Sequence, residues 1–146
     1  MPDTVSTAAR LIGFAGLLPQ AAAVAVIATG DHHGAGRMLA LVYGGLILSF
    51  LGGIWWAWAM RRGAGQAALA IVAVVPSLIA LAGYALGVSV APIRWALVVL
   101  GVAILLTLLV DRRLVASGEA PAGWMGLRVP LSLGLGALTI LAGALP

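Results

Sequence analysis

The chain contains no cysteine and no lysine. Without cysteine it can form no disulfide, no thiolate metal site and no cysteine nucleophile, and its redox compartment is left open. All eight basic residues are arginines, charged residues make up 8% of the sequence and hydrophobic residues 63%. This composition excludes a soluble domain with a polar coat and predicts a polytopic integral membrane protein.

The formal charge of +4 does not indicate a nucleic-acid partner. The arginines occur singly or in pairs at the ends of apolar runs and never form a stripe among polar neighbours. Anchoring at the membrane surface explains that distribution better than nucleic-acid binding does. We therefore expect the lipid bilayer as the surrounding partner and no nucleic acid.

A long uncharged apolar run covers residues 38–60. It matches the roughly 20 residues with which a helix crosses about 30 Å of hydrocarbon. A cleaved signal peptide is the alternative for the first run, but its core would span only about 7–15 residues. We expect one all-α membrane domain over residues 1–146, a bundle of five transmembrane helices at about 11–29, 38–60, 67–86, 95–110 and 129–145.

Residues 111–128 form the longest predicted connection, helical at first, broken near residues 118–121 and then lying at the membrane interface through Trp124 and Met125. Five crossings place the chain ends on opposite sides. The positive-inside bias then predicts a bacterial inner-membrane protein with a cytoplasmic amino terminus and an external carboxyl terminus. The amino-terminal side carries Arg10, Arg61, Arg62, Arg112, Arg113 and Arg128, and the other side carries Arg37 and Arg94.

When the sequence is aligned with itself at an offset of 57 residues, several proline, glycine and arginine residues at helix breaks and ends coincide. The alignment places Pro19 on Pro76 and Arg37 on Arg94, among other matches that a restricted alphabet also produces by chance. If the repeat is real, the first four helices form two tandem hairpins in one orientation, followed by a fifth helix.

Three stretches carry a resemblance to a known family: residues 43–60 (YGGLILSFLGGIWWAWAM), 74–81 (VVPSLIAL) and 111–131 (DRRLVASGEAPAGWMGLRVPL), joined by GLLP at 16–19. They resemble domain-of-unknown-function family 3429, a bacterial and mitochondrial membrane family whose animal members include transmembrane protein 69. The resemblance implies a small five-helix integral membrane protein and no established activity. The resemblance also leads us to expect a basic residue, His or Arg, at the position of Trp55 in many relatives. This chain has tryptophan there, so the resemblance does not support a role of that side chain in proton or anion handling.

No Asp, Glu, Lys, Arg or His lies between the predicted interfaces. Mid-membrane charges usually serve proton relays, ion sites or voltage sensors, so pumps and ion-coupled transporters are disfavoured. The sequence also offers no nucleophile–base pair or metal triad, and we expect no enzyme, no cofactor and no metal. Asp31, His32 and His33 are adjacent in a glycine-rich loop and would make only a weak, non-preorganised metal site.

Gln20, Ser49 and Ser77 are the polar residues closest to mid-depth. Pro76 frees the carbonyl of Val72, which something must satisfy in hydrocarbon. We expect Gln20 to donate to that carbonyl. The pair is either ordinary hydrogen bonding between helices or a polar spot in an intramembrane cavity.

Small residues recur on single faces of three predicted helices, which permits close helix packing. The alternative is a slot beneath Trp56, the tryptophan expected to point inward, for a flat hydrophobic ligand. The three faces are Gly45, Ser49, Gly53 and Trp56; Ser132, Gly136, Thr139 and Gly143; and Gly13, Gly16, Gln20 and Ala23. The cavity candidates are Gln20, Ser49, Gly52, Gly53, Trp56, Pro76 and Ser77.

The expected cytoplasmic anchors or headgroup ligands are Arg61, Arg62, Asp111, Arg112 and Arg113.

The absence of a reactive constellation and the glycine faces favour a non-enzymatic protein that acts through helix contacts. It would be a subunit, an assembly or scaffold protein with a membrane-protein partner, or a homo-oligomer. The alternative is a binder or facilitator of a small apolar or planar molecule in an intramembrane cavity.

Overall fold

The computed structural model describes residues 5–30, 34–89, 92–121 and 123–146, and within these ranges it is helical without strands. Five stretches are long and apolar enough to cross a membrane, with α1 and α2 sharing the first crossing. The chain is thus an all-helical, multi-pass membrane protein with five spans. The helices are α1 (Thr7–Ala15), α2 (Leu18–Ala28), α3 (Ala35–Ala59), α4 (Gln66–Ser89), α5 (Ile93–Ala116) and α6 (Trp124–Ala144).

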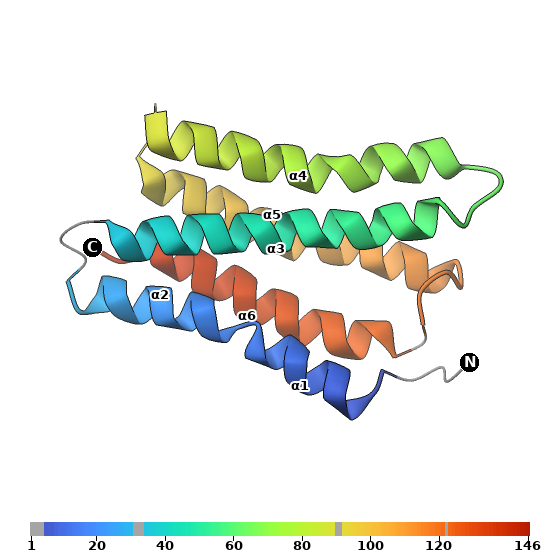
Figure 1. Ribbon diagram of the computed structural model, residues 1–146, viewed down its shortest axis with the longest axis horizontal. Coiled ribbons are helices and arrows are strands. Elements are labelled where there is room, and N and C mark those ends of the chain that lie inside the picture. Colours follow the sequence, from blue (N-terminus) through green and yellow to red (C-terminus); the bar gives the residue numbers. More distant parts are fainter. Residues whose placement is uncertain (1–4, 31–33, 90–91, 122) are drawn as a thin grey trace.

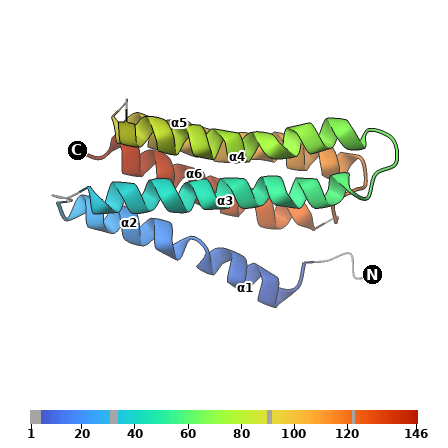
Figure 2. The same cartoon turned by 45° about the horizontal axis from the view of Figure 1, so that its top comes forward.

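The helices lie side by side along the long axis, with the two chain ends at opposite ends of the bundle (Figure 1). Consecutive crossings alternate in direction, as short connections between adjacent helices require. In both ribbon views α1 diverges from α3 toward the N-terminus, whereas α2 stays close to α3 (Figures 1 and 2). The first crossing therefore packs against the bundle over only part of its length.

The first crossing is broken, where the sequence predicted one continuous helix. Helix α1 ends at Ala15 and α2 begins at Leu18, with Pro19 in its first turn. Proline has no N–H, and its ring clashes with the carbonyl four residues earlier, here that of Ala15. The Tyr43 hydroxyl donates to the carbonyl of Gly16 at 2.5 Å, which satisfies a backbone group at the break.

The fourth and fifth predicted helices are both longer than expected, because the predicted 111–128 connection is mostly helical. Helix α5 continues to Ala116, and α6 already begins at Trp124. The turn comes at Gly118, whose positive φ of 74° suits glycine. The N–H groups of Gly118 and Glu119 bond to carbonyls of the last turn of α5, which is a Schellman motif. Arg128 therefore lies inside a helix instead of at its end.

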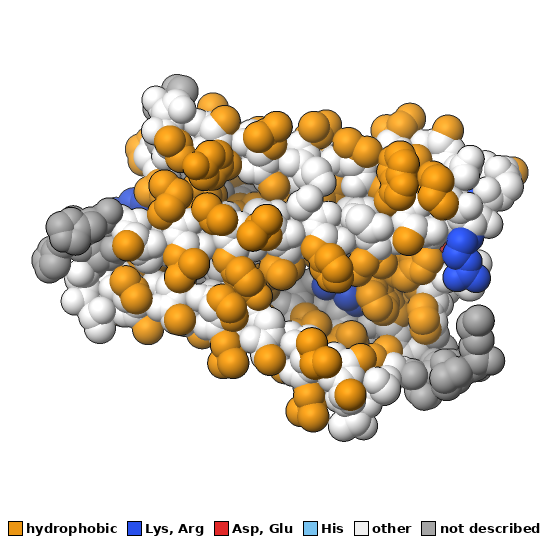
Figure 3. Space-filling view, viewed as in Figure 1, with side chains coloured by type: hydrophobic (Ala, Val, Ile, Leu, Met, Phe, Trp, Pro, Cys, Tyr) orange, Lys and Arg blue, Asp and Glu red, His pale blue; other side chains and the backbone are white. Residues whose placement is uncertain are grey.

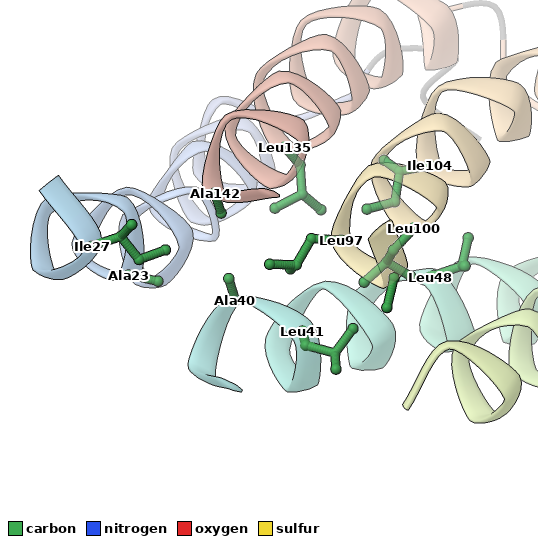
Figure 4. Close-up of a cluster of buried hydrophobic side chains, with 11 residues drawn as sticks. Ala23, Ile27, Ala40, Leu41, Leu48, Leu97, Leu100, Ile104, Leu135 and Ala142 are labelled. Carbon is green, nitrogen blue, oxygen red and sulfur yellow. The ribbon is translucent and has the colours of Figure 1, made fainter. Parts of the chain in front are cut away.

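The central core joins four of the crossings. Figure 4 shows its side chains meeting from α2, α3, α5 and α6, with Leu97 of α5 near the middle. The predicted small-residue face of the fifth helix is confirmed, since Ser132, Gly136, Thr139 and Gly143 are all buried. The buried cluster contains Ala23, Ile27, Ala40, Leu41, Leu48, Ala96, Leu97, Leu100, Ile104, Leu135 and Ala142.

The predicted inward face of α3 is wrong for two of its four residues. Trp56 is 45% exposed, and a Cβ added at Gly53 would meet no atom within 4 Å. The reason is the position of α4, which approaches α3 at Gly52, where a Cβ would collide with the carbonyl of Ala73. That contact fixes the rotation of α3 and turns Gly53 and Trp56 outward.

Arginines hold both ends of the bundle. Arg37 and Arg94 donate to main-chain oxygens at the end of α6, which lack helical partners. At the opposite end Arg62 and Glu119 form a two-bond ion pair at 2.5 Å. Hydrogen bonds from Arg62 and then from Ser117 lower the pKa of Glu119 to about 2. This pair ties the end of α3 to the α5–α6 connection at neutral pH, so Arg62 does not stand free as a headgroup ligand.

Gly101→Ala tests the packing of α5 on α6. Its Cβ would lie 2.6 Å from Ile140 Cγ1 and 2.8 Å from the carbonyl oxygen of Gly136, so the helices must separate. We expect a loss of about 1–3 kcal/mol in the free energy of unfolding, measured by denaturation in detergent. Gly53→Ala is the matched control and should change it by less than about 0.5 kcal/mol. Equal effects of the two changes would contradict this packing.

Candidate functional site: a buried ion pair beside a lipid-facing cavity

An ion pair joins α5 to α6 in the interior of the bundle. Arg128 Nε lies 2.7 Å from Asp111 Oδ2, and the two residues are only 5% and 1% exposed. Arg128 Nη2 also donates a hydrogen bond to Thr107 Oγ1 at 3.1 Å, and the Thr107 hydroxyl donates one to the carbonyl of Ile104. Both charged groups are thus hydrogen-bonded within the protein.

Trp55 completes this cluster from α3. Its indole Nε1 donates to Asp111 Oδ1 at 2.9 Å, so each carboxylate oxygen accepts one hydrogen bond. Trp55 is 3% exposed and points inward in place of Trp56, which the sequence analysis had expected there. Neighbouring residues of a helix point about 100° apart, so an error of one position exchanges an inward side chain for an outward one.

Aromatic rings from two elements lie near the cluster. Trp58 and Trp124 meet edge to face with ring centroids 5.3 Å apart. The guanidinium carbon of Arg128 lies 6.0 Å from the centroid of the Trp124 ring, within reach of a cation–π attraction. Trp124 was expected in an interfacial connection, but it is the first residue of α6 and packs here.

The ion pair lies within the membrane-crossing helices. Arg128 is about 6 Å from the start of α6 and Asp111 about 8 Å from the end of α5, at 1.5 Å per residue. The expectation that both charged residues lie in the connection outside the helices was therefore wrong. So was the grouping of Asp111 with Arg112 and Arg113, because Asp111 is buried while both arginines are exposed. Removing a single charge from such a pair is costly, because its partner stays buried and unpaired.

A spacing signal for both charged residues was present in the sequence. Asp111 follows Ile104 and Thr107 at helical spacing, so it continues the buried face of α5. Arg128 stands one turn before Ser132 and so continues the small-residue face of α6. Sequence reasoning missed both because it treated charges as markers of helix ends.

A cavity of about 220 Å³ lies beside Arg128, between the first crossing, α3, α5 and α6. Figure 3 shows a hollow on the face viewed there, with basic atoms at its bottom. Arg128 and Ser132 are its polar lining residues, and the others are apolar or glycine. The lining is Ile12, Gly13, Gly16, Leu17, Ile47, Phe50, Leu51, Ile104, Arg128, Leu131, Ser132 and Leu135.

Two hydrogen-bonding groups at this cavity have no partner in the described part of the chain. The Ser132 hydroxyl belongs to a residue that is 1% exposed, yet it makes no hydrogen bond there. Arg128 uses Nε and Nη2 in the bonds above, and its Nη1 makes none with the described residues. Buried polar groups are normally satisfied, so the buried Ser132 hydroxyl marks a place for a ligand or water, with the Arg128 guanidinium, which also lines the cavity, beside it.

Gln20 does not pair with the carbonyl freed by Pro76, as the sequence analysis had expected. Its Nε2 donates to Thr139 Oγ1 at 2.9 Å and lies 3.4 Å from the carbonyl oxygen of Ala40. These contacts tie α2 to α6 and α3, because the first crossing packs beside α6. Pro76 packs against Gly52 in the separate α3–α4 contact.

The seven predicted cavity residues do not line one common cavity, although four of them meet between α3 and α4. Ser49 and Ser77 share a hydrogen bond of 2.8 Å between α3 and α4, Gly52 and Pro76 belong to the same contact, and Gly53 and Trp56 face outward. None of the seven lines the cavity beside Arg128.

The predicted loop site of Asp31, His32 and His33 lies outside the described residues. Elsewhere, in the part of the chain that is described, no group of three potential metal ligands occurs.

The site and the five crossings lie within one family match. Residues 5–144 match the model of the family described as protein of unknown function (DUF3429). The chain belongs to this family. The resemblance found in the sequence is thereby confirmed for nearly its whole length. No curated protein and no solved structure matches the chain.

Breaking the ion pair from one side should be far more harmful than removing both halves. Asp111→Leu or Arg128→Met alone should each cost about 3–5 kcal/mol, because one charge remains buried and unpaired. The double variant should cost much less than the sum, measured by unfolding in detergent. Arg112→Met, on the exposed side of the same turn, is the control and should change stability little. Additive single effects would contradict the pairing.

Proposed function

We propose that this membrane protein binds a small, mostly apolar molecule in the cavity beside Arg128. The observation that carries the proposal is the Ser132 hydroxyl, which is buried and unpartnered among the described residues and lines an otherwise apolar cavity. An apolar wall with a few convergent polar groups is the usual composition of a small-molecule site. Lateral access from the bilayer suits such a ligand, since α1 diverges from the bundle on this side (Figure 2).

We further propose that the protein binds without catalysing a reaction and needs no cofactor. Ser132 is the hydroxyl at the cavity, but no base lies within hydrogen-bonding distance of it in the described residues. A serine nucleophile needs such a base to activate it. Asp111 is occupied by Trp55 and Arg128, so it is not placed to serve. Binding or facilitated passage of a ligand is the function that these contacts support.

Filling the cavity should displace the ligand. Leu131→Trp adds bulk at the cavity wall, whereas Leu133→Trp adds the same bulk at a position on α6 that is exposed and does not line the cavity. Small molecules extracted from purified protein would be identified and quantified by mass spectrometry. We expect a molecule retained by the wild type and by Leu133→Trp, with occupancy lowered roughly tenfold in Leu131→Trp. Equal retention by both variants would contradict this site.

A second candidate function is that of a subunit or scaffold that packs against a partner helix or a second copy. It is favoured by α1, which buries none of its residues in the bundle and diverges from it (Figure 1). Affinity purification in a mild detergent would test it. A stoichiometric protein that is lost when α1 carries bulky polar substitutions would support this function, and a solitary monomer would count against it.

We propose that the chain lies in the bacterial inner membrane with its amino-terminal side in the cytoplasm. The support is the five arginines other than the buried Arg128 on the amino-terminal side, Arg10, Arg61, Arg62, Arg112 and Arg113, against Arg37 and Arg94 on the other. A reporter that is active only outside the cytoplasm should be active when fused after Pro146 and silent when inserted within residues 61–66. The reverse pattern would overturn this orientation.

A further inference from the structure

We propose that the molecule bound beside Arg128 and Ser132 is neutral and presents a carbonyl oxygen to them, with a mostly apolar body in the rest of the cavity. This inference rests on the proposed binding function and adds the chemical class of the ligand. It follows from three features of the site: the donors that it offers, the charge that it already holds, and its size.

The unused polar groups at the cavity call for an acceptor. An arginine nitrogen can only donate, and a serine hydroxyl can donate as well as accept. Arg128 and Ser132 are four residues apart on α6, so their side chains lie on one face about 5–6 Å apart at Cβ. A carbonyl oxygen has two lone pairs and can accept from both. An alcohol oxygen could also accept from Arg128, but its own hydrogen could go only to Ser132, whose hydroxyl hydrogen would then still lack an acceptor.

The charge balance of the site favours a neutral acceptor over an anion. Arg128 is already paired with Asp111, and among the described residues no other charged side chain lines the cavity. A carboxylate or phosphate would therefore leave one uncompensated negative charge in a membrane interior, which is strongly unfavourable. A carbonyl group adds no net charge, so it gains the hydrogen bonds of the donors without that penalty.

The volume limits the ligand to a compact apolar body. At about 220 Å³ the cavity is smaller than the roughly 300–1,000 Å³ typical of sites for drug-sized molecules. Phe50, Ile47 and Leu131 are among the side chains that would contact this body. Two sources share this chemistry in a membrane: a free ring ketone of the quinone class, and the ester carbonyl of a lipid with part of its acyl chain.

A matched pair of probes isolates the carbonyl. The probes are 2-methyl-1,4-naphthoquinone and 2-methylnaphthalene, which share a ring body and differ in the two carbonyl groups. Equilibrium dialysis of the full chain in detergent would give both dissociation constants, corrected for partition into protein-free micelles. Because the chain contains neither cysteine nor lysine, the quinone meets no thiol or lysine amine to which it could add covalently.

Ser132→Ala tests the hydrogen bond without disturbing the ion pair. We expect it to weaken binding of the naphthoquinone roughly 2- to 10-fold and to leave binding of methylnaphthalene unchanged. Ser49→Ala is the matched control, because Ser49 pairs with Ser77 away from the cavity and should affect neither probe. An Arg128 variant is avoided here, since it would leave Asp111 buried and unpaired.

Competing ligands distinguish the remaining possibilities. Displacement of the naphthoquinone by a short-chain phosphatidylcholine supports the carbonyl inference with a lipid ester as the source, and failure of that lipid to compete supports the free ring ketone. Stronger competition by octanoate than by its methyl ester would show an anion site and overturn the inference. Equal affinity for the two ring probes, unaffected by Ser132→Ala, would also overturn it but leave the binding function intact. If neither probe bound and the purified protein carried no molecule, both proposals would fail.

Discussion

The buried pair of Asp111 and Arg128 is the constraint on which the arrangement of α3, α5 and α6 depends. Neither charge can be left unpaired at that depth, because an uncompensated charge in hydrocarbon costs several kcal/mol. The pair therefore fixes where α6 begins relative to the end of α5. The chain between the two helices is short, and it reverses direction at the Gly118 turn. The second carboxylate oxygen accepts from Trp55, so it joins α3 to the pair in the rotation that the Gly52 contact with α4 imposes.

Much of the fold could be predicted from the sequence, because apolar run length and small-residue spacing are local properties. Five crossings and the buried face of α6 followed from them. The ends of the helices could not be predicted in this way. A charged residue near the end of an apolar run suggests a helix end, whether its side chain contacts lipid headgroups or an opposite charge within the protein. Asp111 and Arg128 are 17 positions apart, and only the fold shows that they meet.

The site was harder to predict, because it depends on helix rotation. Trp55 and Trp56 have the same chemistry and adjacent positions, and the approach of α4 at Gly52 decides which of them points inward. The family resemblance had suggested a basic residue where this chain has Trp55. In the structure that position faces the Asp111 carboxylate, and the indole N–H makes the kind of contact that a basic side chain would make there. The position of Trp55 therefore supplies a hydrogen-bond donor to Asp111 without carrying a charge.

One face of α6 carries three polar residues at successive depths, and the middle one, Ser132, makes no hydrogen bond to the described residues. Arg128 is bound by α5, and Thr139 is bound by Gln20 of α2. Ser132 lies between them on the same face, beside the cavity that Gly16 and Leu17 at the break of the first crossing also line. Pro19 interrupts that crossing, and α1 diverges while the Gln20 contact keeps α2 in place. The unused hydroxyl and the space beside it thus lie against the broken part of the first crossing, so the segment where the helix is interrupted forms one wall of the site.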